Sequence, residues 1–193
     1  MSAEPIDEWH RPPAEGYFAD DLDRIPGLPA HTELIDGSLV LMSPQKRFHM
    51  KALRLLESAL VTLVPWDFFR VSREMSVVLG PRQRLEPDVL VVHADAEVDD
   101  DVTWYPADAV VLAVEVVSPD SEERDRKRKP QLYADAGIPH YWRVEKVSGK
   151  IVLYVFELES ATRQYLPTGI FHDRVELDVP FKIVIDLTEV ERM

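Results

Sequence analysis

PDVLVV at residues 87–92 and LAVEVVSP at residues 112–119 are the two segments of this sequence that decide the fold. Each is a short apolar run rich in valine, with one acidic residue, Asp88 or Glu115, inside it. Runs of this kind are typical of strands that are buried on both faces of a sheet. A carboxylate inside such a strand is costly unless it is paired or binds a metal. The two acids, 27 residues apart in neighbouring segments, therefore predict one shared site.

The composition limits the kinds of protein that this chain can be. Its 193 residues, 46% of them hydrophobic, suffice for one domain with a substantial core. No membrane span and no signal peptide are expected, because no apolar stretch approaches roughly 18 residues and the start is acidic. The absence of cysteine excludes disulfides and thiolate metal sites and favours a reducing cytoplasm. With a net charge of −13, binding to DNA would require a local basic patch or metal ions.

The chain is expected to begin with an irregular arm, residues 1–30, followed by a domain over residues 31–193. The arm holds five of the fifteen prolines and shows little periodicity. Its aromatic residues Trp9, Tyr17 and Phe18 are candidates to anchor it. Because exposed aromatic clusters usually mark an interface, the arm also favours a homodimer.

Apolar periodicity predicts a mixed α/β fold with more strand than helix. Helices are expected over 45–63 and over 118–136, the second ending at Gly137. The acidic segment 94–108 is expected to be a loop. Strands are expected over 33–42 (a hairpin turning at Asp36-Gly37), 68–79, 85–93, 109–117, 140–144, 150–158, 163–166 and 175–185.

Asp88 and Glu115 form a candidate metal site. Side-chain alternation along residues 109–117 places Glu115 on one face of its strand, together with Val117. Mg²⁺ is usually bound by one or two carboxylates together with water and phosphate oxygens. Asp88, at the start of its strand, and Glu115 would supply that pair. The alternative is that one carboxylate is solvated and the other forms a salt bridge.

The second helix carries polar residues at a spacing of four. Ser121, Asp125, Lys129 and Tyr133 are therefore expected on one helix face. Pro130 disfavours helical geometry at Lys129 and removes a backbone hydrogen bond, so we expect the helix to kink or restart there.

Two further features are better explained as ordinary structure. The basic cluster of this helix is favoured as a solvated surface at Arg124, Lys127 and Arg128. His49, on the first helix near the candidate site, is a lone histidine, and such residues more often have a structural role.

These residues together resemble the Uma-two family of proposed bacterial restriction endonucleases, within the PD-(D/E)XK nuclease superfamily. The resemblance covers roughly residues 30–187 and depends on a combination of short motifs. The matching positions are PD at 87–88, EVVSP at 115–119, Asp125, Lys129, Tyr133, GIP at 137–139, YW at 141–142 and Val144, with ELIDG at 33–37, MSP at 42–44 and His49 upstream.

The resemblance implies a restriction-endonuclease-like fold, a central mixed sheet flanked by helices. It implies that Asp88, Glu115 and Val116 are metal ligands for Mg²⁺, with Mn²⁺ as an alternative, and that the ion activates water for attack on a phosphodiester. Glu33 would add a third catalytic carboxylate. The superfamily has a lysine two residues after the second acid, where this chain has valine. The family match moves that catalytic lysine to Lys129.

Three functions remain open at this point. The first is a metal-dependent DNA endonuclease, with DNA as substrate and a homodimer suited to cutting both strands of a duplex. The second is a nuclease-fold protein without catalysis that serves as a binding or assembly module. The third is a metal-dependent hydrolase of small phosphoesters, which the acidic surface would tolerate better.

Overall fold

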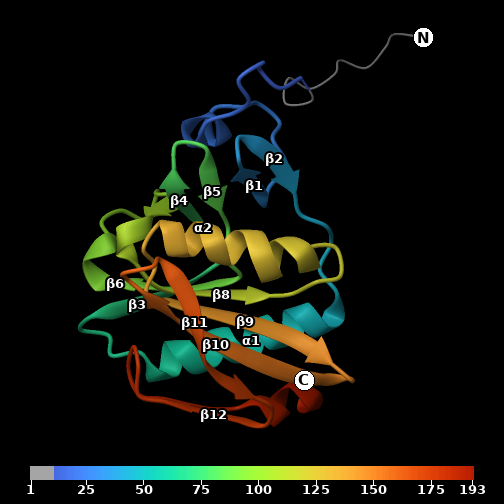
Figure 1. Cartoon of the computed structure of the whole chain (residues 1–193), viewed down its shortest axis with the longest axis vertical. Coiled ribbons are helices and arrows are strands. Elements are labelled where there is room, and N and C mark those ends of the chain that lie inside the picture. The colour runs from blue at the N-terminus through green and yellow to red at the C-terminus, as the bar shows by residue number, and fades with distance from the viewer. Residues whose placement is uncertain (1–10) are drawn as a thin grey trace.

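The computed structural model describes residues 11–193 and has a six-stranded mixed sheet at its centre (Figure 1). The strand order is β11-β10-β9-β8-β6-β3; β8 and β9 are parallel, and the other neighbours are antiparallel. The strands are β3 (Phe69–Arg73), β6 (Val89–His93), β8 (Val110–Val116), β9 (His140–Val147), β10 (Lys150–Glu159) and β11 (Gln164–Phe171). The expected mixed α/β class is confirmed, and the two acid-bearing segments belong to adjacent strands.

A smaller five-stranded sheet, in the order β2-β1-β5-β4-β7, lies at one end of the central sheet (Figure 1). Its strands are β1 (Thr32–Ile35), β2 (Ser38–Leu41), β4 (Ser76–Gly80), β5 (Gln83–Leu85) and β7 (Trp104–Pro106). The expected hairpin over 33–42 is present as β1 and β2. The expectation of a loop over 94–108 is wrong at β7, which pairs with β4.

Three segments expected as single strands are each divided into two. Residues 68–79 split into β3 and β4 at Glu74, whose φ of 50° breaks the extended chain. Residues 85–93 split between β5 and β6, because Pro87 cannot donate a hydrogen bond to a sheet. Residues 175–185 form a hairpin of β12 (Arg174–Leu177) and β13 (Ile183–Asp186). The first two divisions connect the small sheet to the central one.

The two longer helices lie on opposite faces of the central sheet. α1 (Arg47–Leu63) matches the expected helix over 45–63. α2 (Lys129–Asp135) is preceded by a π-helical segment, Arg124–Arg128. The expected restart near Pro130 is present as a change from π-helix to α-helix at Lys129. The non-helical geometry expected at Lys129 is wrong, because this residue has helical dihedrals of φ −60° and ψ −47°. The amide of Lys129 donates to Arg124 O, five residues back, and this wider turn accommodates a proline without a free amide.

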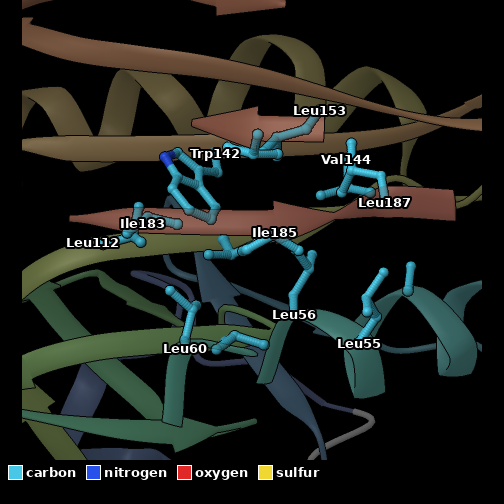
Figure 2. Close-up of a cluster of buried hydrophobic side chains, with 14 of the residues drawn as sticks. Leu55, Leu56, Leu60, Leu112, Trp142, Val144, Leu153, Ile183, Ile185 and Leu187 are labelled. Atoms are coloured by element: carbon cyan, nitrogen blue, oxygen red, sulfur yellow. The ribbon is translucent and has the colours of Figure 1, made fainter. Parts of the chain in front are cut away.

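The face of the sheet that α1 covers is apolar. Leu55, Leu56 and Leu60 of α1 pack in one cluster with side chains of the sheet and of the β13 region (Figure 2). Their partners in Figure 2 are Leu112, Trp142, Val144, Leu153, Ile183, Ile185 and Leu187. Burial of one leucine side chain stabilises a fold by about 1.5–3 kcal/mol. This cluster therefore holds the sheet against α1 and fixes the strands that carry the acids.

The opposite face combines apolar residues with charged ones. Tyr133 of α2 packs there with Leu90 of β6 and Ala113 of β8. Tyr141, which the family resemblance includes, is fully buried in the same cluster. The buried charged residues described below belong to this side of the sheet.

The expected arm is partly covered by the domain. Tyr17 and Ala19 are buried with Leu34 of β1, and the ring of Phe18 lies near the guanidinium of Arg82. Trp9 lies outside the described residues. The boundary at residue 30 stays a prediction. No helix within residues 11–193 is both long and apolar enough to span a membrane.

Candidate active site

Asp88 and Glu115 project from the same face of the central sheet. Antiparallel pairing of β6 with β8 sets Leu90 opposite Ala113. Continued by two residues, this register brings Asp88 opposite Glu115, on the face of the sheet that α2 covers. Residues directly opposite each other have Cβ atoms about 4.5–5.5 Å apart. At that separation, two carboxylates can share one ion.

Both oxygens of Asp88 are held by neighbouring groups. The amide of Val116 donates to Asp88 Oδ2 at 2.6 Å. His49 Nε2 lies 2.9 Å from Asp88 Oδ1, and both side chains are about nine-tenths buried. His49 belongs to the first turn of α1, so the helix on the apolar face also fixes this carboxylate. His49, for which a structural role was favoured, therefore contacts a candidate metal ligand directly.

Lys129 joins the acids from three other elements. Its Nζ lies 2.8 Å from Glu33 Oε1 of β1 and 3.0 Å from Glu115 Oε2 of β8. Asp125 Oδ1, in the π-helical segment, lies 3.5 Å from the same nitrogen. Lys129 is 1% exposed, and the three acids are similarly buried. The structure therefore brings together Glu33, Glu115 and Lys129, three of the residues that the resemblance assigned to catalysis.

The π-helical segment keeps the four-residue spacing on one side of the helix. An α-helix has 3.6 residues per turn, so positions four apart drift around its axis; a wider turn offsets the drift. Tyr133 Oη accordingly donates to Glu115 Oε1 at 2.6 Å, and Ser121 Oγ donates to Asp125 Oδ2. The shared face expected for Ser121, Asp125, Lys129 and Tyr133 is confirmed by these contacts.

Burial and charge act against each other at Lys129. Burial alone would lower the pKa of its ammonium group, but the surrounding carboxylates outweigh burial and raise that pKa well above its ordinary value. Lys129 therefore remains a cation. At Val117, the usual position of the superfamily lysine, the side chain would share the face of Glu115, so Lys129 delivers its charge to the same side of the strand from α2.

One lysine does not neutralise this cluster. Burial raises the pKa of Glu115 well above its usual range; Lys129 offsets this only in part, and the neighbouring acids raise it further. Burial also raises the pKa of Asp125, against the lowering effects of Lys129 and Ser121. When its acids are ionised, the cluster has an excess of negative charge, which either bound protons or a second cation would offset.

A solvent-accessible cavity of about 470 Å³ opens onto these acids. Asp88, Glu115 and Asp125 line it, whereas Glu33 is fully buried beside Lys129. Other parts of its wall come from the β2–α1 connection, the turn between β3 and β4, and the start of the second helix: Ser43, Pro44, Gln45, Lys46, Arg73, Glu74, Ser118, Asp120, Ser121 and Arg124.

The donor set fits a hard divalent cation. Asp88 and Glu115 offer carboxylate oxygens, and the only oxygen of Val116, which also lines the cavity, is its backbone carbonyl. Within residues 11–193, no three acidic or histidine side chains form a ready-made metal cage. Mg²⁺ commonly uses one or two carboxylates and takes its remaining ligands from water and substrate. The excess charge of the carboxylates supplies the electrostatic reason for such an ion.

Three residues of the site were not assigned a role from the sequence. Asp125 and Tyr133 contact Lys129 and Glu115, and their four-residue spacing was the signal that could have identified them. Arg124 lines the cavity, although the basic cluster around it favoured a solvated surface. Lys127 is exposed as expected, whereas Arg124 and Arg128 are both half-buried, and Arg128 also pairs with Asp36. The sequence neighbours of Arg124 gave no indication of its position.

The comparison with protein families agrees with this arrangement. The family model described as "Uma2: Putative restriction endonuclease" matches residues 19–188. The chain belongs to the Uma2 family. Its match extends over both sheets, α1, α2 and each of the acids above.

A solved structure has a similar fold. It is the crystal structure of a "putative nuclease belonging to DUF820" from Anabaena variabilis, with a TM-score of 0.65 and 16% sequence identity. The similarity covers 83% of this chain and 88% of that chain. None of the curated proteins compared with this chain matches it. Family and fold together support a nuclease.

Proposed function

We propose that this Uma2 protein is a metal-dependent DNA endonuclease that hydrolyses phosphodiester bonds with Mg²⁺, or with Mn²⁺ in its place. The observation that carries the proposal is the contact of Lys129 with Glu115, on the strand next to Asp88 and beside an open cavity. A buried lysine and paired acids on adjacent strands are what the superfamily resemblance requires of a nuclease site. The family match and the shared fold support the same class of activity.

The residues divide into two groups in this proposal. Asp88, Glu115 and the carbonyl of Val116 would hold the ion. When bound, such an ion acts as a Lewis acid toward the phosphate and promotes the ionisation of water. Lys129 fixes the orientation of Glu115 and Glu33, and its positive charge is available as negative charge builds up on the phosphate.

Asp88→Asn tests the proposal most directly. The substitution keeps the size of the side chain and an oxygen that can accept from the Val116 amide, but it removes the negative charge. We expect cleavage of plasmid DNA in Mg²⁺ or Mn²⁺ to fall by about 10³-fold, as loss of a few kcal/mol of transition-state stabilisation requires. Calorimetry should show weaker Mn²⁺ binding by the same variant.

Asp95→Asn is the matched control, because Asp95 is exposed in the acidic segment. It makes the same chemical change outside the cavity and should cleave at the parental rate. Equal cleavage by Asp88→Asn and the parent would contradict the assignment of Asp88. If the parental protein hydrolyses small phosphodiesters but not DNA, the result would favour the alternative function, a metal-dependent hydrolase of small phosphoesters.

The burial of Lys129 favours a second candidate function. With 1% exposure and contacts to three acids, Lys129 satisfies the role of a structural counter-ion without any reaction. The protein would then be a nuclease-fold binding or assembly module. DNA binding without cleavage in either metal ion would support this candidate over the endonuclease.

We further propose that the protein acts as a homodimer in the cytoplasm. A two-fold assembly suits the cutting of both strands of a duplex, and a chain without cysteine suits a reducing compartment. Of the aromatic residues expected to promote dimerisation, Tyr17 is buried within the chain, and Phe18 is 44% exposed. Light scattering at micromolar concentration should give the mass of a dimer; the mass of a monomer would contradict the proposal.

A further inference from the structure

Most charged residues of the cavity wall have a partner of opposite charge. His49 contacts Asp88, and Arg73 contacts Glu74. His31 contacts Glu86, and Lys129 contacts the remaining acids of the site. Within residues 11–193, the charged lining residues without an ion pair are Lys46, Arg124 and Asp120.

Arg124 stands apart from the other cations of its helix. Arg126 pairs with Glu122 and Glu145, Lys127 with Glu123, and Arg128 with Asp36. The guanidinium of Arg124 makes no ion pair and no hydrogen bond with any residue of the described chain. Its Nε is also buried without an acceptor.

An unsatisfied buried donor of this kind requires an explanation. Leaving such a donor unpaired costs free energy, and the cost is larger for a charged group than for a neutral one. Arg124 directly precedes Asp125 and follows Ser121 by three residues, so it lies at the acidic part of the cavity. A bound anion would supply the missing acceptor.

Lys46 provides a second unpaired cation from another element. It precedes α1 directly as the N-cap residue, and it lines the same cavity as His49 of the first helical turn. Lys46 also lines a second hollow, together with Arg47 and Lys146, that shares His49 and Ser118 with the cavity. Glu122 and Glu145 also line this hollow, but both pair with Arg126, so Lys46, Arg47 and Lys146 leave it with an excess of positive charge.

We propose that Arg124, assisted by Lys46, binds a phosphate of the DNA strand adjacent to the phosphate that is cleaved. This assignment rests on the proposed function and adds a substrate-binding subsite to it. The planar guanidinium can bind two oxygens of one phosphate with a fixed pair of parallel N–H donors, a geometry that an ammonium lacks. In a protein with a net charge of −13, such local cations are needed to retain a polyanion.

The position of Arg124 favours the adjacent phosphate over the cleaved one. A cleaved phosphate must touch the ion held by Asp88 and Glu115, and so lie beside these carboxylates. The guanidinium of Arg124 forms no ion pair with either acid, although all three residues line the same cavity. Arg124 therefore binds substrate equally in the ground state and the transition state, and its loss should raise KM without lowering kcat.

Arg124→Gln, Arg124→Lys and Lys127→Gln test this subsite. Lys127→Gln is the matched control, because it removes one positive charge from the same helical segment at an exposed residue paired with Glu123. For Arg124→Gln, we expect KM for duplex DNA to rise about 10-fold, with kcat within about two-fold of the parent. The dependence of log Kd on log salt, measured by fluorescence anisotropy in Ca²⁺, should decrease by about one.

Arg124→Lys should bind DNA more tightly than Arg124→Gln but less tightly than the parent, because lysine keeps the positive charge without the two-pronged geometry of the guanidinium. Lys127→Gln should match the parent in KM. Unchanged KM in Arg124→Gln, an equal rise in Lys127→Gln, or a fall in kcat at constant KM would each overturn the subsite. These outcomes would not contradict the proposed endonuclease function, since the parent protein would still cleave DNA. A parent that neither binds nor cleaves DNA would overturn the proposed function and the subsite with it.

Discussion

The two faces of the central sheet are stabilised in different ways. Under α1, neighbouring strands present leucine, valine, isoleucine and tryptophan side chains that pack together in one apolar cluster (Figure 2). On the other face, the same strands present Asp88 and Glu115, and Lys129 meets Glu115 from α2. Strand β8 contributes to both faces through alternation of its side chains.

The difference shows where the fold tolerates change and where it does not. Apolar packing is non-directional and accepts other residues of similar volume. A buried ion cluster depends on pairing, because removal of one partner leaves charges without compensation. Here the pairing is incomplete, since the acids outnumber Lys129. The face that carries the site is therefore the one that responds to charge, pH and added cations.

The largest effect on stability is expected for Lys129→Met. The substitution keeps much of the volume but leaves Glu33, Glu115 and Asp125 buried without their shared cation. We expect the free energy of unfolding at neutral pH to fall by about 3–5 kcal/mol in urea denaturation. Cleavage should be lost as well, since no other lysine contacts these acids within the described chain.

Two comparisons sharpen this prediction. Lys127→Met, at an exposed residue of the same segment, should change the free energy of unfolding by less than about 0.5 kcal/mol. Added Mn²⁺ should restore part of the stability of Lys129→Met, because the ion replaces the missing positive charge. A loss of the same size in both variants would show that the ion cluster does not stabilise this face.

Leu56→Ala probes the apolar face and should cost somewhat less, about 3 kcal/mol. Leu56 is fully buried in the cluster of Figure 2, and truncation leaves a cavity there. The loss should be independent of pH and of Mn²⁺, since Leu56 packs among apolar side chains. Denaturation curves with and without Mn²⁺ test this, and rescue by the ion would contradict the division between the two faces.

The stability of the metal-free parent should depend on pH, and this effect should be smaller than the loss expected for Leu56→Ala. It should come from the charged face. Burial raises the pKa of the carboxyl groups of Glu115 and Asp125 in the folded state. A carboxyl with a raised folded pKa favours folding fully below its unfolded pKa, and this contribution disappears as pH rises through the folded value. In chelator, we therefore expect the melting temperature to fall as pH rises above about 5. Mn²⁺ should reduce this fall, and a rise in stability over the same range would contradict the prediction.

The sequence predicted the strands of the site better than their division between sheets. The valine-rich runs around Asp88 and Glu115 identify β6 and β8, since continuous burial leaves a strong local signal. The splits at Glu74 and Pro87 were missed although polar residues interrupt both segments there, SRE at 72–74 and EPD at 86–88. Short polar interruptions also occur within single strands that have one exposed face. Local periodicity does not indicate whether two halves of a run belong to one sheet or to two.

The site could be predicted only in part for a similar reason. The resemblance identified Glu33 and Lys129, and the four-residue spacing placed Asp125 on the same helix face. The sequence rule for proline gave the wrong geometry at Lys129, because a π-helical turn resolved the conflict locally. Arg124 could not be identified, since its distinguishing property is the lack of a partner, which depends on the tertiary position of every nearby acid.

The smallest effect is expected for the loss of one hydrogen bond, in Tyr133→Phe. Tyr133 Oη donates to the carboxylate of Glu115 at 2.6 Å, whereas Tyr141 Oη donates to the backbone carbonyl of Asp125 at 2.8 Å. Both tyrosines are fully buried, so Tyr141→Phe is a control with the same change in volume. Hydrogen bonds to charged groups contribute about 1.5–3 kcal/mol and neutral ones about 0.5–1.5 kcal/mol. Tyr133→Phe should therefore lower the free energy of unfolding by about 1 kcal/mol more than Tyr141→Phe. At acid pH, where Glu115 is protonated, the difference between the two variants should disappear; equal losses at neutral pH would mean that Glu115 is already uncharged there.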